Sequence, residues 1–209
     1  MKMKTKNIIA CIAFLFAAQA VIAQNNAEAF IRLIINQLKS HKNVEMTFNY
    51  QISPDGKNLG ETEKGHAWLQ GESYKVEMTD QQTISNGTTI WTYFVDAEEV
   101  MVSNASEGAD NTPLKVLTSL DENYVASLTG IDANGIATVE LANPAGQYKR
   151  VTLKINTKKV ELKGADVYFE DGNKFVITVE EMKYDQELDD KFFTFDTKKH
   201  PNVDVIDMR

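Results

Sequence analysis

The sequence predicts a mainly β protein with a few helices, built from about ten or eleven short antiparallel strands. Three observations support this. Apolar and polar residues alternate strictly in several segments, most clearly in Val44–Ile52. Turn signals recur at roughly 8–12-residue intervals. Only two segments have the apolar spacing of a helix. This pattern is typical of a sandwich, a barrel or a strongly curved sheet.

The first 23 residues have the layout of a secretory signal peptide. Lysines stand at positions 2, 4 and 6, and an unbroken apolar run covers Ile8–Ala18. Small or modest residues precede a cleavage point near Ala23, as such leaders require. Cleavage there would leave residues 24–209 as one domain. We therefore expect an exported protein that resides in the periplasm.

Other interpretations of this leader are open. A transmembrane anchor would need a longer apolar run, because a bilayer is spanned by about 20 residues. Cleavage after Ala20 would also satisfy the pattern. Cys11 does not fit a lipoprotein signal, because most of the apolar run follows it.

The composition excludes several classes of function. The mature part has no cysteine, so disulfides, a cysteine nucleophile and thiolate metal sites are ruled out. Without the leader's lysines, 19 basic residues face 30 acidic ones, a net charge of −11. An acidic surface argues against nucleic acid or an anionic membrane as a partner.

Helices are expected at the start and in the middle of the mature chain. Ala27–Lys39 carries apolar residues at helical spacing, and Asn25 or Asn26 can cap it. A second helix can begin at Pro113 and run to about Leu120.

Strand character extends through the rest of the chain. Ser53–Gly56 is a turn signal that follows Val44–Ile52. Asn86-Gly87 is a strong hairpin signal that precedes Thr88–Val95. Further segments with strand character lie at Glu61–Leu69, Tyr74–Met78, Gln82–Ser85, Thr88–Val95, Glu99–Ser103, Tyr124–Leu128, Ile136–Leu141, Tyr148–Ile155, Val160–Lys163, Val167–Phe169 and Lys174–Tyr184.

Catalytic chemistry is hard to build from these residues. His41, His66 and His200 are scattered and match no metal-ligand spacing. The carboxylate pairs Glu180-Glu181 and Asp189-Asp190 are neighbours in sequence, and neighbours on a strand point to opposite faces. Phosphate-binding loops and nucleophile elbows are absent from the sequence. We expect neither an enzyme nor a metal or cofactor.

Large apolar side chains are abundant at the alternating positions. They can form an ordinary core, or they can line an apolar cavity beneath a helical lid, because two helices are few to cover about ten strands. The candidate cavity residues are Met46, Phe48, Tyr50, Trp68, Tyr74, Val76, Met78, Trp91 and Tyr93. The candidate lid residues are Phe30, Ile34, Leu38, Leu114 and Leu117.

Six motifs, in order, resemble the periplasmic outer-membrane lipoprotein carrier family (LolA-like). An N-terminal helix precedes the alternating strand, which is followed by a glycine-led strand with tryptophan. An aromatic strand, a turn before a Trp-x-Tyr strand, a mid-chain helix and a closing segment complete the series. The six motifs follow the helix, and they are Val44–Ile52, Gly65–Leu69, Tyr74–Met78, Ile84–Tyr93, Asn111–Leu114, and Leu188–Phe195 with Pro201–Ile206.

This resemblance implies an incomplete β-barrel closed by a helical lid. It also implies a carrier that takes the acyl chains of lipoproteins from an inner-membrane release complex to an outer-membrane receptor, without making or breaking a bond. The cargo could instead be another lipid. We expect a monomer that binds no nucleic acid.

One position departs from the family pattern. The family often carries an arginine after the tryptophan strand, which helps to close the lid, and Gly71 stands at the matching place. A different latch, or a lid that is always partly open, is therefore expected. The family's downstream cavity aromatic matches Tyr74.

Two other functions compete with the carrier. A lipid-binding sensor or scaffold could use the same half-barrel, and retention of inner-membrane regulators rather than processed lipoproteins would reveal it. A lipid hydrolase would need a nucleophile or metal that the sequence does not offer.

Overall fold

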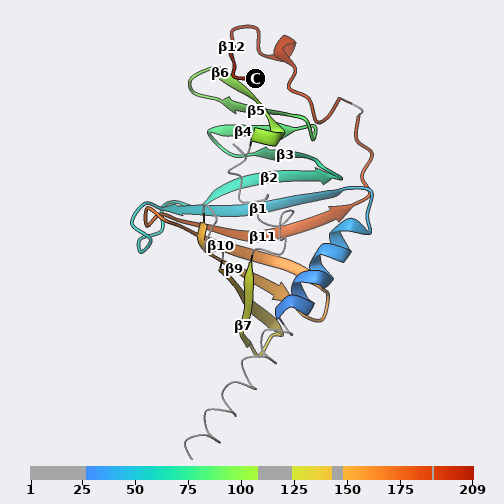
Figure 1. Ribbon diagram of the computed structural model, residues 1–209, viewed down its shortest axis with the longest axis vertical. Helices are drawn as coiled ribbons and strands as arrows, with labels where there is room; N and C mark the ends of the chain where they lie inside the picture. The colour runs from blue at the N-terminus through green and yellow to red at the C-terminus, as the bar shows by residue number, and fades with distance from the viewer. Residues whose placement is uncertain (1–26, 108–123, 143–147, 190) are drawn as a thin grey trace, which may run out of the picture.

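The twelve strands of the computed structural model form one continuous sheet (Figure 1). The structure describes residues 27–107, 124–142, 148–189 and 191–209. The strands are β1 (Val44–Ser53), β2 (Glu63–Gln70), β3 (Ser73–Glu77), β4 (Gln81–Ser85), β5 (Thr89–Phe94), β6 (Glu99–Asn104), β7 (Val125–Ile131), β8 (Ile136–Ala142), β9 (Tyr148–Asn156), β10 (Glu161–Phe169), β11 (Lys174–Tyr184) and β12 (Asp204–Asp207).

The sheet is open, with β12 at one edge and β7 at the other. The order across it is β12-β6-β5-β4-β3-β2-β1-β11-β10-β9-β8-β7, so β1 and β11 lie near the middle. The mainly β, curved-sheet prediction is thus confirmed. Its strand number was low: β12 was missed, and it pairs with β6 in parallel, whereas the other pairs are antiparallel.

One α-helix is described, over residues 27–39, at the position predicted for the first helix. Two 3₁₀ turns, η1 (Ala105–Glu107) and η2 (Thr197–Lys199), complete the regular structure of the described residues. The predicted leader, residues 1–23, and the predicted helix at 113–120 lie outside the described residues.

The two faces of the sheet are defined by the alternation in β1. Met46, Phe48 and Tyr50 are buried on what we call the inner face, whereas Thr47 and Asn49 lie on the outer face. Residues directly opposite one another on neighbouring strands share a face. The register therefore extends this assignment through the whole sheet.

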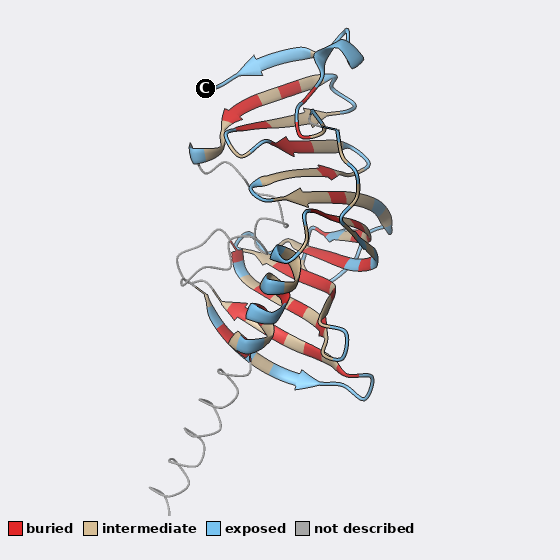
Figure 2. Cartoon of the chain, turned by 90° about the vertical axis from the view of Figure 1, so that its right-hand side faces the viewer, coloured by how far each residue is buried: buried red, intermediate tan, exposed pale blue. Residues whose placement is uncertain are grey.

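The inner face carries the main core. Apolar side chains from the helix and from strands on both sides of β1 form one buried cluster there. Figure 2 shows the helix beside strands that carry many buried residues. From the helix come Ala27, Ile31 and Ile34, and from β8 to β10 come Val139, Leu141, Val151, Leu153, Ile155, Leu162, Ala165 and Val167. The helix thus lies on the apolar side of the sheet.

The outer face has its own, smaller core over β2 to β6. The described residues between β11 and β12 from 186 onward (186–189 and 191–203), which we call the C-terminal segment, pack onto this face. Phe193 and Phe195 of the segment are buried against Ile84 and Val100. The remaining outer face, over β8 to β11, is charged, and Asp166 there pairs with both Lys154 and Lys174.

Close approach fixes glycine at two positions of the sheet, one on the inner face and one on the outer face. Gly65 lies opposite Phe48, and a Cβ atom at Gly65 would overlap the Phe48 ring. Gly164 lies against the backbone of Ile177, where a side chain would meet the carbonyl oxygen. A β-bulge at Thr47/Phe48 adds local bending to the same region.

We expect Gly65→Ala to destabilise the protein by about 1–3 kcal/mol, because the new methyl group must displace a buried aromatic ring. Gly130→Ala is the matched control, since Gly130 also lies in a strand but has open space around it. Urea unfolding followed by circular dichroism measures both. Equal stability of the two variants would contradict this account of Gly65.

Candidate functional site

Four of the predicted cavity residues form the fixed floor of the inner face. Met46, Phe48, Tyr50 and Val76 are each at most 5% exposed. Ala67 on β2 lies opposite both Met46 on β1 and Val76 on β3, and it is also buried. These side chains are held by packing with their neighbours and give the face its shape.

Tyr50 is fixed by polar contacts as well as by packing. Its hydroxyl donates to Oε2 of Glu63 at 2.8 Å and accepts from the backbone N–H of Thr79 at 3.2 Å. Its ring stacks on Phe175 with centroids 5.5 Å apart. Burial raises the pKa of the Tyr50 hydroxyl, because the phenolate would lose its hydration.

Half-buried apolar side chains surround this floor. Tyr74 lies opposite Leu69 in the β2–β3 ladder, and Met78 follows at the end of β3. On the other side of β1, Phe169 and Met182 are similarly placed against the core. These half-buried groups are the inner-face residues best able to meet a ligand.

The structure does not bring Trp68, Trp91 and Tyr93 together with these residues, so the predicted set of nine was wrong as a single surface. Trp68 lies opposite Glu45 and Lys75, one position away from the inner-face residues of the same strand. The three aromatics belong to the outer cluster.

The C-terminal segment covers these outer aromatics. Phe192 meets Trp68 edge-on at 5.2 Å, and Phe195 lies 5.4 Å from Tyr93. A sequence signal for this arrangement existed. Phe192, Phe193 and Phe195 are three large apolar residues outside any alternating strand, and such residues need a surface to bury them.

The predicted lid residues of the first helix face the inner core. Ile34 is buried, and Phe30 and Leu38 are half-buried against the cluster. Leu114 and Leu117, the other predicted lid residues, lie outside the described residues. The described helix therefore covers part of the inner face.

Polar contacts fasten the C-terminal end of this helix to the end of β11. The Asp185 carboxylate accepts hydrogen bonds from Nδ1 of His41 at 2.8 Å and from the backbone N–H of Lys42 at 2.6 Å. The His41 ring stacks on Tyr184 at 4.1 Å. The hydrogen bond from His41, followed by that from Lys42, lowers the pKa of Asp185.

A buried side-chain amide adds two hydrogen bonds between the start of β1 and the residues that follow β11. Asn43, only 2% exposed, donates to the carbonyl of Gln186 at 2.8 Å and accepts from its backbone N–H at 2.9 Å.

Gly71, the position that departs from the arginine pattern, lies in an exposed turn with φ of +59°. This left-handed conformation suits glycine and would strain an arginine.

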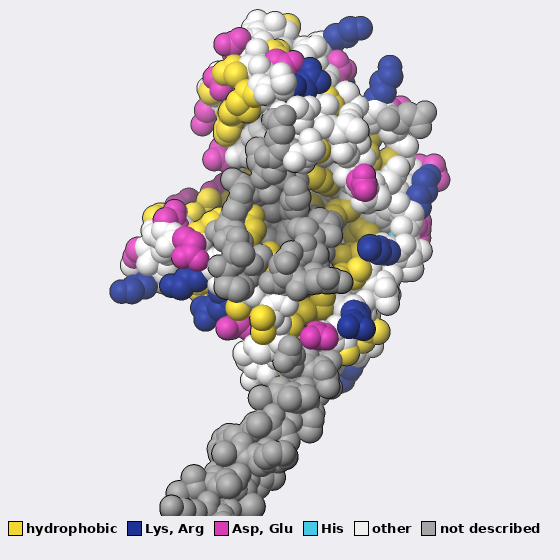
Figure 3. All heavy atoms as spheres, in the orientation of Figure 1, with side chains coloured by type: hydrophobic (Ala, Val, Ile, Leu, Met, Phe, Trp, Pro, Cys, Tyr) yellow, Lys and Arg dark blue, Asp and Glu magenta, His cyan; other side chains and the backbone are white. Residues whose placement is uncertain are grey.

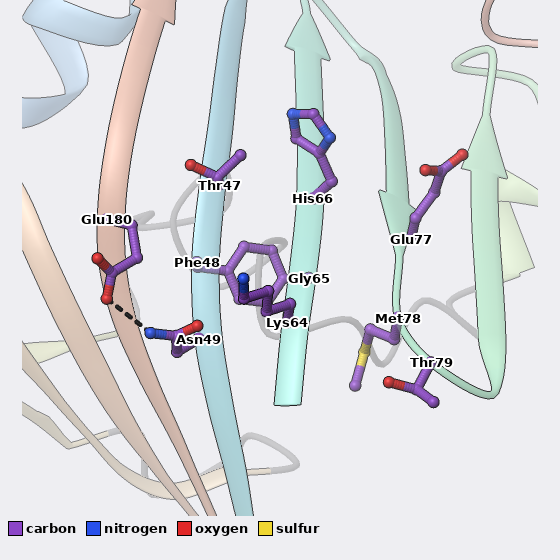
Figure 4. A pocket seen from close by; sticks show the side chains of 10 residues that line it. All are labelled: Thr47, Phe48, Asn49, Lys64, Gly65, His66, Glu77, Met78, Thr79 and Glu180. Carbon is purple, nitrogen blue, oxygen red and sulfur yellow. Dashed lines mark hydrogen bonds between the residues drawn. The ribbon is translucent and has the colours of Figure 1, made fainter. Parts of the chain in front are cut away.

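A concavity lies across β11, β1, β2 and β3 (Figure 4). Its lining is mostly polar and belongs mainly to the outer face. It includes Thr47, Asn49, His66, Glu77 and Glu180, with the Asn49 amide donating to Glu180 at 2.6 Å. This groove differs from the apolar inner face in both position and chemistry.

The described part of the chain contains no group of three or more His, Cys, Asp or Glu side chains that could hold a metal ion. Within the same residues, no helix combines the length and apolarity needed to cross a bilayer.

The open curved sheet, whose apolar inner face is partly covered by a helix, defines a half-barrel protein. The family described as "Outer membrane lipoprotein carrier protein LolA" matches residues 39–196, and the chain belongs to this family. An outer-membrane lipoprotein carrier protein of Francisella tularensis is 24% identical over 207 residues, covering 97% of both chains. One from Vibrio parahaemolyticus is 28% identical over 205 residues, covering 94% of this chain and 92% of the relative.

Solved structures resemble the fold at low sequence identity. An uncharacterized conserved protein from Thermus thermophilus has a TM-score of 0.58 and 12% identity, covering 87% of this chain and 99% of that chain. A LolA superfamily protein from Nitrosomonas europaea has a TM-score of 0.44 and 13% identity, covering 81% of this chain and 97% of that chain. The first likeness supports the fold alone.

We expect Asp185→Asn to loosen the C-terminal end of the helix. The pKa of Asp185 is lowered in the folded protein, so the charged contact contributes fully above the ordinary carboxylate pKa and is lost as pH falls through the lowered value. At pH 7 the amides of residues 37–42 should exchange about two- to fivefold faster in the variant. Hydrogen–deuterium exchange measures this.

Acidification provides the control. The wild-type protein should approach the exchange pattern of the variant as pH falls through the lowered pKa of Asp185, after correction for intrinsic exchange rates. Identical protection of residues 37–42 in both proteins at pH 7 would show that Asp185 does not fasten the helix.

Proposed function

We propose that this protein is a periplasmic carrier that binds the acyl chains of lipoproteins on its inner sheet face and transports them from the inner to the outer membrane. The observation that carries the proposal is the continuous apolar inner face, which extends from β3 across β1 to β8 and lies against an amphipathic helix. Membership of the LolA family supports the same ligand class. The signal-peptide pattern of residues 1–23 supports export to the periplasm.

The proposed acyl contacts are the half-buried side chains of the inner face. Leu69, Tyr74 and Met78 on one side of β1, with Phe169 and Met182 on the other, are the side chains we assign to this role. Methionine and aromatic groups suit chains of varied length and bend, because the thioether is adaptable and flat rings offer broad contact. The fixed floor beneath them would keep the sheet rigid while a ligand enters.

The energetics of such a carrier require binding that is reversible. Each buried CH₂ group contributes about 0.8 kcal/mol, so a long acyl chain could bind too tightly to be released. A surface covered by a helix can balance this, because displacing the buried helix residues Ala27, Ile31 and Ile34 costs part of the gain. No bond needs to form or break, so the proposal requires neither a catalytic residue nor a cofactor.

Transport also requires a donor and an acceptor. We infer an inner-membrane release complex as the donor and an outer-membrane receptor as the acceptor. Figure 3 shows charged side chains largely around the margins of the face and hydrophobic ones toward its middle. A charged margin around an apolar surface is compatible with brief docking to two such partners.

Tyr74→Glu should weaken acyl binding by at least about tenfold, because a carboxylate on the inner face would have to be desolvated by the chain. The matched control is Ser73→Glu, which adds the same charge to the same strand on the outer face. Titration of a fluorescent fatty acyl probe into each purified protein, monitored by fluorescence, measures the difference.

Three outcomes would overturn the proposal. They are wild-type protein that takes up no probe, two variants that lose binding equally, and a protein that captures inner-membrane regulators but no processed lipoprotein. The last would favour a sensor with the same fold. Thermal unfolding of both variants establishes that a loss of binding is not a loss of folding.

A further inference from the structure

Within the described part of the chain, the outer edge of β12 has no partner strand. β12 (Asp204–Asp207) is the last described strand at its end of the sheet, and its ladder partner is β6. All four of its residues are exposed, and Figure 2 shows the strand exposed along its whole length. An exposed edge strand presents backbone groups to which another strand can be added.

The hydrogen bonds of β12 identify which backbone groups are available. The N–H groups of Asp204 and Met208 donate to Glu98 and Val102 at the β6 side, at 2.9 and 2.8 Å. Backbone direction alternates along a strand, so the N–H and C=O groups of Val205 and Asp207 point away from β6. Two donors and two acceptors therefore face outward.

Exposed apolar side chains accompany these backbone groups. Val205, Ile206 and Met208 are 47%, 37% and 47% exposed and lie within four consecutive residues. Val205 is in register with the outer-face residue Val100, and Ile206 with Met101 on the inner face. An added strand with alternating apolar residues would thus find an apolar neighbour on each face.

The charge around this edge is negative. Asp204 lies beside Glu99 in the ladder, and Asp96 and Glu98 precede β6. Among the described residues, none of these four carboxylates takes part in an ion pair, whereas Asp207 is paired with Arg209 at 2.6 Å. Like charges side by side on neighbouring strands are unfavourable, and a cation placed between them removes that cost.

The same charges disfavour a second copy of this chain as the occupant. Pairing of β12 with itself would add a second Asp204 and its acidic surroundings to an edge that is already negative. The chain as a whole is also acidic, with a net charge of −8, so two copies repel each other. A basic strand has no such conflict. Charge complementarity therefore selects a partner with Lys or Arg residues over self-association.

We propose that the β12 edge is a docking site for an extended basic segment of a partner protein, with apolar and Lys or Arg residues in alternation, bound by strand addition. The backbone of Val205 and Asp207 supplies the hydrogen bonds. Val205 and Ile206 supply apolar contacts, and Asp204 and Glu99 favour the positive charge. The site is separate from the acyl contacts, because β4, β5 and β6 lie between β12 and β3.

A fluorescein-labelled peptide of four Lys-Val repeats tests this proposal by anisotropy with the full mature protein. Val205→Pro removes an outward N–H without removing a β6 hydrogen bond, and proline is tolerated at such edge positions. Val205→Ile is the matched comparison, since it keeps both the backbone donor and the apolar side chain. We expect Val205→Pro to weaken binding at least about tenfold relative to Val205→Ile. Circular dichroism checks that both variants fold.

Charge reversal gives a second, independent variant. Asp204→Lys should weaken the Lys-Val peptide and strengthen a Glu-Val peptide of the same length. Hydrogen–deuterium exchange should show protection of residues 204–208 when the Lys-Val peptide binds.

The proposal is overturned if Val205→Pro binds the peptide as tightly as the wild type does, or if the Glu-Val peptide binds the wild type equally well. It is also overturned if the protein is a dimer in solution that Val205→Pro dissociates, because the edge would then serve a second copy.

Discussion

The structure depends on one constraint, that a single sheet of twelve strands has two faces and each face needs its own cover. Side chains on a strand alternate between faces, so apolar residues at neighbouring positions cannot share one core. β2 illustrates this with Ala67 and Trp68, which are adjacent in sequence and belong to different clusters. The helix covers part of the inner face, and the C-terminal segment covers the outer face of the opposite half.

This division separates the outer cluster, which stabilises β2 to β6, from the inner face, which we propose as the binding surface. The outer aromatic cluster is packed by the chain's own phenylalanines, and Lys75 lies 5.5 Å from the Trp68 ring and 5.0 Å from Phe192. Such a cluster holds β2 to β6 together without using the inner face. The inner face therefore keeps half-buried apolar groups that this outer cluster does not need, and these are the groups we propose as the acyl contacts.

Much of the fold could be predicted from the sequence, because local signals determine it. Strict alternation located β1, and Asn86-Gly87 located the β4–β5 hairpin, where Gly87 has a φ of +87°. The predicted break between Val160–Lys163 and Val167–Phe169 was wrong, since one strand, β10, spans both and contains Gly164. Gly164 resembles a strand breaker when only its sequence neighbours are considered, but its place against the Ile177 backbone needs a glycine.

The candidate site was harder to predict, because it depends on register. Trp91 and Tyr93 alternate as inner-face residues would, and nothing local tells which face they occupy. Their face relative to β1 follows from the series of pairings that links β1, β2, β3, β4 and β5, and each pairing depends on the turn between its two strands. A shift of one residue would have exchanged the faces. The short β12 carries too few residues for its pattern to predict a strand at all.

The absence of an arginine near Gly71 now has a physical context. That turn is left-handed and exposed, and the described helix is fastened at its C-terminal end through Asp185, His41 and Asn43. The bonds of Asp185 are exposed and individually weak, whereas the Asn43 pair is buried and would be retained. Over the core, the helix is held by the apolar packing of Ala27, Ile31 and Ile34. An acyl chain bound as we propose would offer apolar contacts in place of that packing, so the helix could move about its fastened end without breaking a strand pair.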